Sequence, residues 1–303
     1  MPAFPRIAIA TVSLAWLTSF FIPIGFTALM LRCEWLWLIL SVVCVSICSV
    51  LPFPTCGTIR TFLLNGIAEA VGGVQIVSKK EIIEKDRILY AIHPHGLTST
   101  FAGFVLSDIE KRTGRRVGLV VAPLLRWMNP LMRILMGIMG IELLSSNKSC
   151  VQSEMNNGVP IGIVVGGFEE MLRTSKDRDV VFLRNRKGFL KQAARKGYCI
   201  VPIYCFGETQ IYSNRLELGQ RVRDWCAKWK IPAALPFGAG GISFMPRKLN
   251  GGCMIVMGEP MKWTRDQIES ADGLEKVHAQ YMTVVKQLYH EYNPFKGREL
   301  IIV

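Results

Sequence analysis

Two long apolar runs at the start of the chain constrain its fold more than any other feature. No charged side chain occurs in residues 7–31 or in residues 35–51, and only Arg32, Cys33 and Glu34 separate the two runs. A helix that crosses a bilayer core of ~30 Å needs about 20 such residues, so the first run is long enough and the second is marginal. The short polar break predicts a helical hairpin that returns to the side from which it came.

Basic residues flank this predicted hairpin on both sides. Arg6 precedes it, and Arg60, Lys79 and Lys80 follow it, so the positive-inside tendency places both of its ends in the cytosol. A cleaved signal peptide is a poor alternative, because the first run exceeds the usual ~7–15 residues and a second run follows at once. A single re-entrant or interfacial segment stays open, since a proline and a glycine interrupt the first run.

The rest of the chain has the size of one domain. We expect residues 1–54 to form the membrane hairpin and residues 55–303 to form one domain that faces the cytosol. The formal net charge is +13, but the basic residues are spread along the sequence and follow no nucleic-acid-binding motif. An anionic membrane surface or an anionic substrate therefore explains the charge better than nucleic acid. Nine cysteines without paired spacing are typical of a reducing compartment.

Short apolar runs alternate with helical segments throughout this second part. Such alternation predicts an α/β fold with a mostly parallel sheet and flanking helices. Residues 124–139, rich in Leu, Met and Ile, form either a buried helix or a surface that contacts lipid. The predicted strands are residues 74–77, 87–92, 117–122, 160–166 and 198–206, and the predicted helices are residues 59–71, 98–113 and 189–196.

The tetrapeptide HPHG at residues 93–96 directly follows a predicted strand. Chemistry in α/β folds usually lies where strands end, and histidine is the usual general base for activating a hydroxyl. His93 and His95 are therefore candidate bases, and Gly96 leaves the approach to His95 open. A structural histidine pair is one alternative and a metal site is another. We predict no metal, because no further ligand stands at a suitable spacing.

A second motif, GGxxE, ends the predicted strand 160–166. Glu170 offers a carboxylate that can orient a catalytic imidazole and stabilise its charge. Gly166 and Gly167 let a substrate approach the backbone. Taken alone, the glycines are also typical of an ordinary turn, and Glu170 of the first turn of a helix.

A third motif is a basic loop that leads into the predicted helix 189–196. Arg186 and Lys187 can make charge-assisted hydrogen bonds to phosphate, and Gly188 and Phe189 follow them. Taken alone, this basic run is equally typical of a solvated surface.

Together these motifs, in this order, resemble the type-2 diacylglycerol acyltransferase family, which includes the monoacylglycerol and wax-alcohol acyltransferases. The resemblance extends from about residue 52 to the end of the chain. It rests on HPHG at 93–96, GGxxE at 166–170 and RKGFLKQA at 186–193, with weaker matches at 204–208, at 257–260 and in the C-terminal helix. Two motifs depart from the family pattern, PFP at 52–54 in place of tyrosine-phenylalanine-proline and GAG at 238–240 in place of glycine-arginine-glycine.

The resemblance implies an acyl-CoA-dependent O-acyltransferase with a glycerolipid-acyltransferase-like core. It implies conversion of diacylglycerol to triacylglycerol at the endoplasmic reticulum membrane and lipid droplets, with acyl-CoA as a co-substrate and no cofactor. The expected partners are acyl-CoA, acylglycerols and the membrane, and self-association is left open. A monoacylglycerol or long-chain alcohol acceptor is the nearest rival, and a non-catalytic lipid-droplet hairpin is a rival of another class. The expected catalytic residues are His95, His93 and Glu170, and the expected substrate-binding residues are Gly96, Gly166, Gly167, Arg186, Lys187, Gly188 and Phe189.

Overall fold

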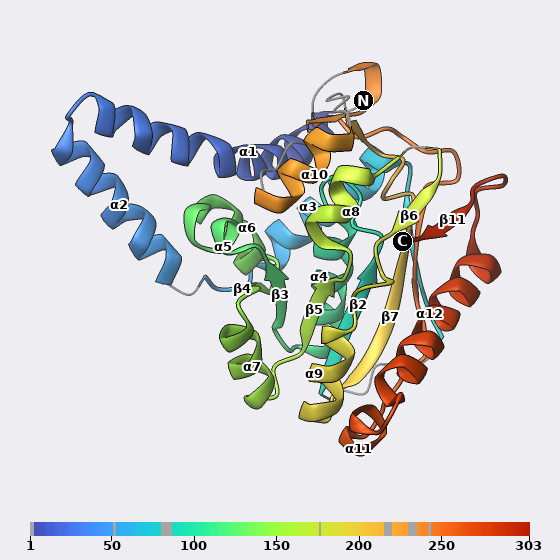
Figure 1. Ribbon diagram of the computed structural model, residues 1–303. Helices are drawn as coiled ribbons and strands as arrows, with labels where there is room; N and C mark the ends of the chain where they lie inside the picture. The colour runs from blue at the N-terminus through green and yellow to red at the C-terminus, as the bar shows by residue number, and fades with distance from the viewer. Residues whose placement is uncertain are drawn as a thin grey trace.

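The computed structural model describes residues 3–50, 53–79, 87–175, 177–214, 220–229, 235–241 and 244–303. A seven-stranded sheet runs through it in the order β1–β10–β7–β2–β5–β3–β4 (Figure 1). The five strands from β7 to β4 are parallel, whereas β1 and β10 at one edge run the opposite way. The strands are β1 Val74–Ser78, β2 Ile88–His93, β3 Val117–Val121, β4 Ile141–Ser145, β5 Ile161–Val164, β7 Cys199–Phe206 and β10 Cys253–Met257.

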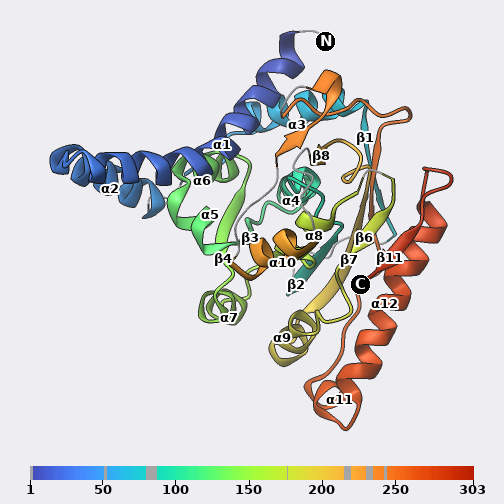
Figure 2. The same ribbon diagram turned by 45° about the horizontal axis from the view of Figure 1, so that its top comes forward.

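Helices cover both faces of this sheet, because alternate residues of a buried strand point to opposite sides. Along β2, Ile88, Tyr90 and Ile92 belong to the core on one face, and Leu89 and Ala91 to the core on the other. The first core includes residues of α1, α3, α4 and α6, and the second includes residues of α7, α9 and α12 (Figure 2). The helices are α1 Ala3–Leu31, α2 Trp35–Val50, α3 Gly57–Val71, α4 Thr100–Thr113, α5 Pro123–Met128, α6 Pro130–Ile138, α7 Lys148–Asn156, α8 Gly167–Arg173, α9 Gly188–Lys196, α10 Gln220–Trp229, α11 Arg265–Glu269 and α12 Gly273–Tyr292.

The predicted α/β class with a mostly parallel sheet and flanking helices is confirmed. The segment 124–139 forms α5 and α6, and buried Asn129 between them accepts a hydrogen bond from the Met132 amide at 2.8 Å, which caps α6. The side chains of Met132 and Leu135 are buried, so α6 is a core helix, while Trp127 on α5 is exposed. The strand β10 and its reversed direction were not predicted.

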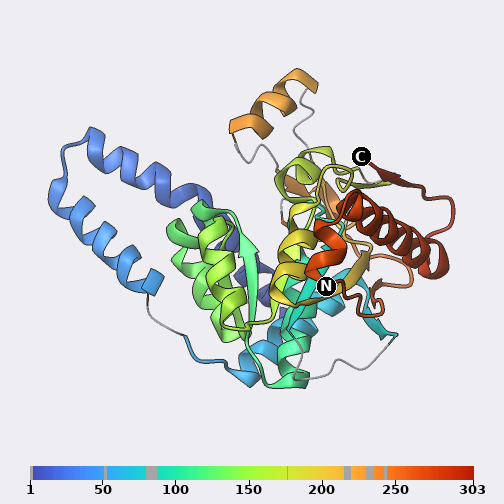
Figure 3. The ribbon, with the colours of Figure 1, turned by 60° about the horizontal axis from the view of Figure 1, so that its bottom comes forward.

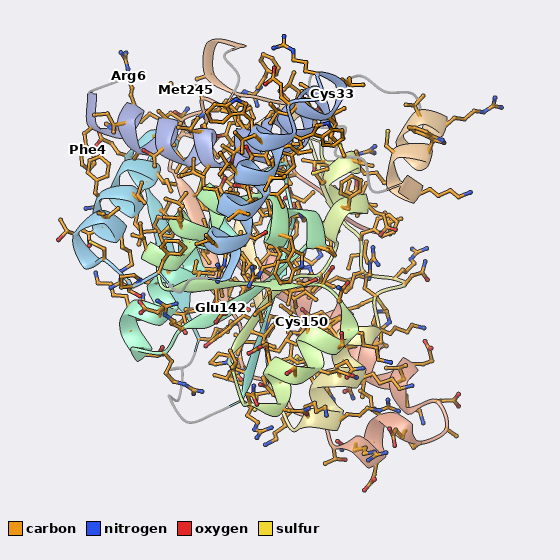
Figure 4. All side chains as sticks on the ribbon, turned by 90° about the vertical axis from the view of Figure 1, so that its left-hand side faces the viewer. Phe4, Arg6, Cys33, Glu142, Cys150 and Met245 are labelled. Carbon is orange, nitrogen blue, oxygen red and sulfur yellow. The ribbon has the colours of Figure 1, made fainter. Side chains whose placement is uncertain are left out.

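The first two helices form an arm that extends from the rest of the molecule (Figures 1 and 3). The start of α1 packs on α3, where the Phe4 and Phe62 ring centroids lie 4.6 Å apart and Ala8 is fully buried. Figure 4 shows Phe4 at this end of α1 and Cys33 at the turn into α2. Large apolar side chains are exposed along the distal part of the arm, namely Ile24, Met30, Leu31, Trp35, Leu36, Trp37, Ile39, Leu40, Val42, Val43 and Ile47.

Among the described residues, no helix is both long enough and apolar enough to cross a membrane. Two helices with a three-residue turn between them lie where the hairpin is expected, but the prediction that the first run spans the bilayer is not confirmed. Pro52 and Lys80, which entered that prediction and the motif comparison, lie outside the described residues.

Two small sheets complete the fold beside the main one. The strands β6 Asp179–Val181 and β11 Leu300–Ile302 pair in parallel, which brings the C-terminus next to the segment after α8. The strands β8 Ser213–Asn214 and β9 Pro236–Phe237 form an antiparallel pair.

Candidate active site

The HPHG segment forms a turn at the carboxyl end of β2, the fourth of the seven strands in the main sheet. The His93–Pro94 peptide bond is cis, and Gly96 has a φ of 59°. A Cβ atom at residue 96 would lie 2.6 Å from Cγ of Glu208. Both the positive φ and this close contact require glycine, because a side chain there is strained and has no space.

His95 is half-buried, and its ring is held by the main chain. Its Nδ1 lies 3.0 Å from the carbonyl oxygen of Gly96. Since a carbonyl only accepts, Nδ1 carries the hydrogen and Nε2 keeps its lone pair. Burial lowers the pKa of His95, and the hydrogen bond to Gly96 acts in the opposite direction. A neutral imidazole with a free Nε2 lone pair is the form that a general base requires.

His93 has a different environment, although it is only two residues away. Its side chain is 1% exposed, and its Nε2 lies 2.9 Å from the hydroxyl oxygen of Tyr281 on α12. Burial lowers the pKa of His93 to about 3, so the ring is neutral at physiological pH. Phe189 packs edge-on against Tyr281, with ring centroids 5.1 Å apart. His93 therefore belongs to a buried aromatic group, and His95 is the more accessible of the two candidate bases.

Glu170 lies at the same turn, but its hydrogen bonds go to main-chain groups. The side chain is fully buried on α8, and its carboxylate accepts hydrogen bonds from the amides of His95 and of Phe182, the latter at 2.8 Å. Burial raises the pKa of Glu170 to about 7, although both amides favour the charged form. Glu170 thus fixes the position of His95 through its backbone.

The two glycines before Glu170 have separate roles. A Cβ atom on Gly166 would collide with the Glu170 carboxylate, so only glycine leaves room for that side chain. Gly167 has a φ of 58° at the start of α8, a conformation that L-residues rarely adopt. The GGxxE motif therefore shapes the turn that carries the buried carboxylate.

The predicted phosphate-binding cations are half-buried and form ion pairs. Arg186 pairs with Glu169, and Lys187 pairs with Glu275 on α12 at 2.5 Å. Gly188 is exposed at the start of α9, and Phe189 is buried in the core. The structure therefore brings His95, Gly96, Gly166, Gly167 and Glu170 together at one turn, and it places Arg186, Lys187, Gly188 and Phe189 around the neighbouring β6–α9 loop and α9.

Two residues near this turn had received no role from the sequence. Tyr281 contacts His93, and Glu208 contacts Gly96. A carboxylate that closely follows an eight-residue buried strand was the available signal for Glu208, because such a group needs a specific partner. Within the described residues, no group of three or more His, Cys, Asp or Glu side chains is arranged to hold a metal ion.

The site thus combines a half-buried imidazole, whose Nδ1 bonds the main chain, with the carboxyl edge of a parallel sheet, which is where α/β folds usually place their chemistry. The sequence profile described as Diacylglycerol acyltransferase matches residues 30–298. The chain belongs to this family and is an acyltransferase, as the motifs predicted. The rival prediction of a non-catalytic hairpin protein is therefore wrong.

Individual relatives carry related names. Diacylglycerol O-acyltransferase 2-like protein 6 of Homo sapiens is 26% identical over 72% of this chain and 70% of its own length. Acyl-CoA wax alcohol acyltransferase 1 of Homo sapiens is 24% identical over 74% of this chain and 72% of its own. Diacylglycerol O-acyltransferase 2 of Dictyostelium discoideum is 28% identical over 72% of this chain and 70% of its own length. No solved structure is significantly similar to the chain.

Proposed function

We propose that this acyltransferase moves an acyl group from acyl-CoA to the free hydroxyl of diacylglycerol and so forms triacylglycerol. The observation that carries the mechanism is the His95 ring, whose Nδ1 donates to the Gly96 carbonyl and whose Nε2 lone pair remains for a substrate proton. The names of the wax alcohol acyltransferase relatives support acyl-CoA as the donor, and those of the diacylglycerol acyltransferase relatives support the acylglycerol acceptor.

The proposed reaction is a single direct transfer. The acceptor hydroxyl gives its proton to Nε2 of His95 while its oxygen attacks the thioester carbonyl carbon. The new carbon–oxygen bond forms, the carbon–sulfur bond breaks, and the coenzyme A thiolate leaves and takes the proton from the imidazolium. Because a thiolate is a good leaving group, the reaction needs neither a covalent enzyme intermediate nor a cofactor.

Arg186 and Lys187 are the proposed contacts for the phosphates of coenzyme A. Their present partners are the carboxylates of Glu169 and Glu275. Surface ion pairs are worth only ~0–1 kcal/mol, so a phosphate can replace the exposed Glu275 beside Lys187 at little cost. The Arg186–Glu169 pair is half-buried, and burial lowers the pKa of Arg186, so the same replacement costs more there. Gly96, Gly166, Gly167, Gly188 and Phe189 remain the proposed residues around the bound substrates.

The exposed apolar arm of α1 and α2 is the proposed membrane contact. Eight exposed large apolar side chains lie on α2 alone, which is far more than a solvated helix normally carries. We propose that the arm anchors the enzyme in the endoplasmic reticulum membrane and on lipid droplets, with the catalytic domain in the cytosol. Diacylglycerol would then reach His95 from the lipid phase, and acyl-CoA from the cytosol.

A monoacylglycerol or a long-chain alcohol is the alternative acceptor. The wax alcohol acyltransferase relatives favour it, because their identity to this chain differs little from that of the diacylglycerol acyltransferases. The test uses purified enzyme in mixed micelles with radiolabelled acyl-CoA and equal concentrations of diacylglycerol, monoacylglycerol and fatty alcohol. A kcat/KM at least about tenfold higher for diacylglycerol is expected, and a preference for either rival acceptor would reassign the substrate.

A further inference from the structure

Glu208 and Thr209 form a buried polar pair directly beyond β7, and the proposed reaction uses neither of them. Each side chain is only 1% exposed. Buried polar groups require hydrogen-bond partners, and a buried carboxylate requires several. The partners of this pair show what it does.

Glu208 caps the helix that follows the HPHG turn. Its Oε1 accepts from the Thr100 amide at 3.0 Å, and its Oε2 accepts from the Phe101 amide at 2.8 Å. Both amides belong to the first turn of α4, where backbone donors have no partner within the helix. Ser99, at the N-cap position, has a φ of 51° and donates its hydroxyl to the His95 carbonyl instead of capping the helix. A carboxylate from the turn after β7 therefore replaces the local cap.

Glu208 also sets the position of Gly96. Its Cγ would lie 2.6 Å from a Cβ at residue 96, so the carboxylate side chain packs directly on the glycine backbone. The carbonyl of Gly96 is the group that holds the His95 ring through Nδ1. The position of the Glu208 side chain thus determines the position of the Gly96 carbonyl, which orients the His95 ring.

Thr209 connects the segment after β7 to the start of β6. Its hydroxyl donates to Oδ1 of Asp179 at 2.5 Å and accepts from Arg298 at 3.0 Å. Arg298 also bonds Asp179 at 2.9 Å, in a buried ion pair. Asp179 begins β6, which leads to Phe182, and the amide of Phe182 donates to Glu170.

These contacts form a closed circuit that begins and ends at the main chain of the HPHG turn. Gly96 contacts Glu208, whose chain neighbour Thr209 bonds Asp179. Asp179 leads along β6 to Phe182, whose amide bonds Glu170, and Glu170 in turn bonds the amide of His95. We propose that Glu208 and Thr209 are positioning residues that hold His95 in its reactive orientation by joining the HPHG turn to α4 and β6. This inference rests on the proposed role of His95 as the base. It also makes Arg298 and the C-terminal strand β11 supports of the active site.

The test compares three variants of the full-length enzyme. Glu208→Gln keeps the volume but loses the charge and turns an amide donor toward a backbone amide. Thr209→Val deletes the buried hydroxyl that bonds Asp179. Ser107→Ala is the matched control, because it deletes a fully buried hydroxyl on α4 whose bond to the Met139 carbonyl, at 2.9 Å, lies away from the turn. Each protein is measured for kcat, KM for acyl-CoA, melting temperature and amide hydrogen exchange of residues 94–104.

For Glu208→Gln we expect kcat to fall about tenfold to hundredfold and KM to change less than about threefold, because the loss concerns orientation rather than binding. Thr209→Val is expected to lower kcat at least about threefold. Both variants should speed exchange in residues 94–104. Ser107→Ala should lower the melting temperature and keep kcat.

The inference is overturned if Glu208→Gln keeps kcat within about twofold, if exchange at residues 94–104 is unchanged, or if Ser107→Ala loses kcat equally. His95→Ala in the same assay separates the two proposals. Full activity of that variant would refute the base itself, and the exchange data would still decide whether the pair holds the turn.

Discussion

Replacing Glu170 by glutamine should make the enzyme slower and, above neutral pH, relatively more stable. Burial raises the pKa of this carboxyl from 4.5 to about 7, so the folded state retains a proton that the unfolded state has already released. Stability therefore falls as the pH rises from about 4.5 to 7. At about 1.4 kcal/mol per pH unit, the cost above pH 7 is about 3 kcal/mol.

The Glu170→Gln variant carries no such proton. Between pH 5 and pH 8 its free energy of unfolding should therefore rise by up to about 3 kcal/mol relative to that of the parent enzyme. Urea or thermal unfolding in mild detergent at each pH measures this difference. Glu208, whose pKa burial also raises to about 7, contributes a slope of the same sign in both proteins, and buried His93, whose pKa is lowered, contributes an opposite slope below about pH 6.5. The difference between the two proteins therefore isolates the contribution of Glu170. An equal slope in both proteins would refute the burial argument.

The turnover rate of the same variant should fall, although its stability at high pH rises relative to the parent. Glutamine offers one acceptor oxygen where the carboxylate holds two amides, from His95 and from Phe182. Displacement of the catalytic backbone by about 1 Å can cost about hundredfold in rate, so we expect kcat to fall ten- to hundredfold with little change in KM for acyl-CoA. An effect on KM alone would reassign Glu170 to substrate binding, and no effect would make it a residue of the helix start only.

Three further predictions concern other parts of the molecule. Tyr281→Phe removes the hydroxyl that pairs with Nε2 of buried His93, so the free energy of unfolding should fall by about 1–3 kcal/mol. Because His93 is not the proposed base, kcat should change less than tenfold, and denaturant unfolding and steady-state kinetics measure the two effects. Lys187→Ala should raise KM for acyl-CoA more at low salt than at high salt and leave kcat unchanged, whereas a salt-independent effect would exclude a phosphate contact. Asn147 is exposed before α7 and begins the N-glycosylation sequon Asn147-Lys148-Ser149. If the domain faces the cytosol, as proposed, this residue should carry no glycan in a eukaryotic host, and a mobility shift that vanishes in Asn147→Gln would place the domain in the lumen.

The local parts of the fold followed from the sequence. The strand before the HPHG motif and the α9–β7 unit were predicted correctly, because apolar runs bounded by glycine fix both their type and their limits. Gly197, expected to end a helix, is its C-cap in the left-handed conformation.

The long-range parts did not follow from the sequence. Lys187 pairs with a carboxylate 88 residues away, and Glu208 reaches amides 107 and 108 residues before it. No local pattern encodes such partners, because they depend on the order of strands in the sheet. For the same reason the acidic residue of GGxxE was expected to meet the imidazole, whereas its hydrogen bonds go to the main chain.

The rate of acyl transfer by purified His95→Ala tests the central claim most directly. The assay supplies labelled acyl-CoA and diacylglycerol, with His93→Ala and the parent enzyme beside it and acyl-CoA affinity measured separately. Loss of a general base typically lowers the rate ~10²–10⁴-fold, so His95→Ala should lose that much while still binding acyl-CoA and folding normally. Turnover near that of the parent enzyme, or a larger loss in His93→Ala with His95→Ala active, would contradict the account.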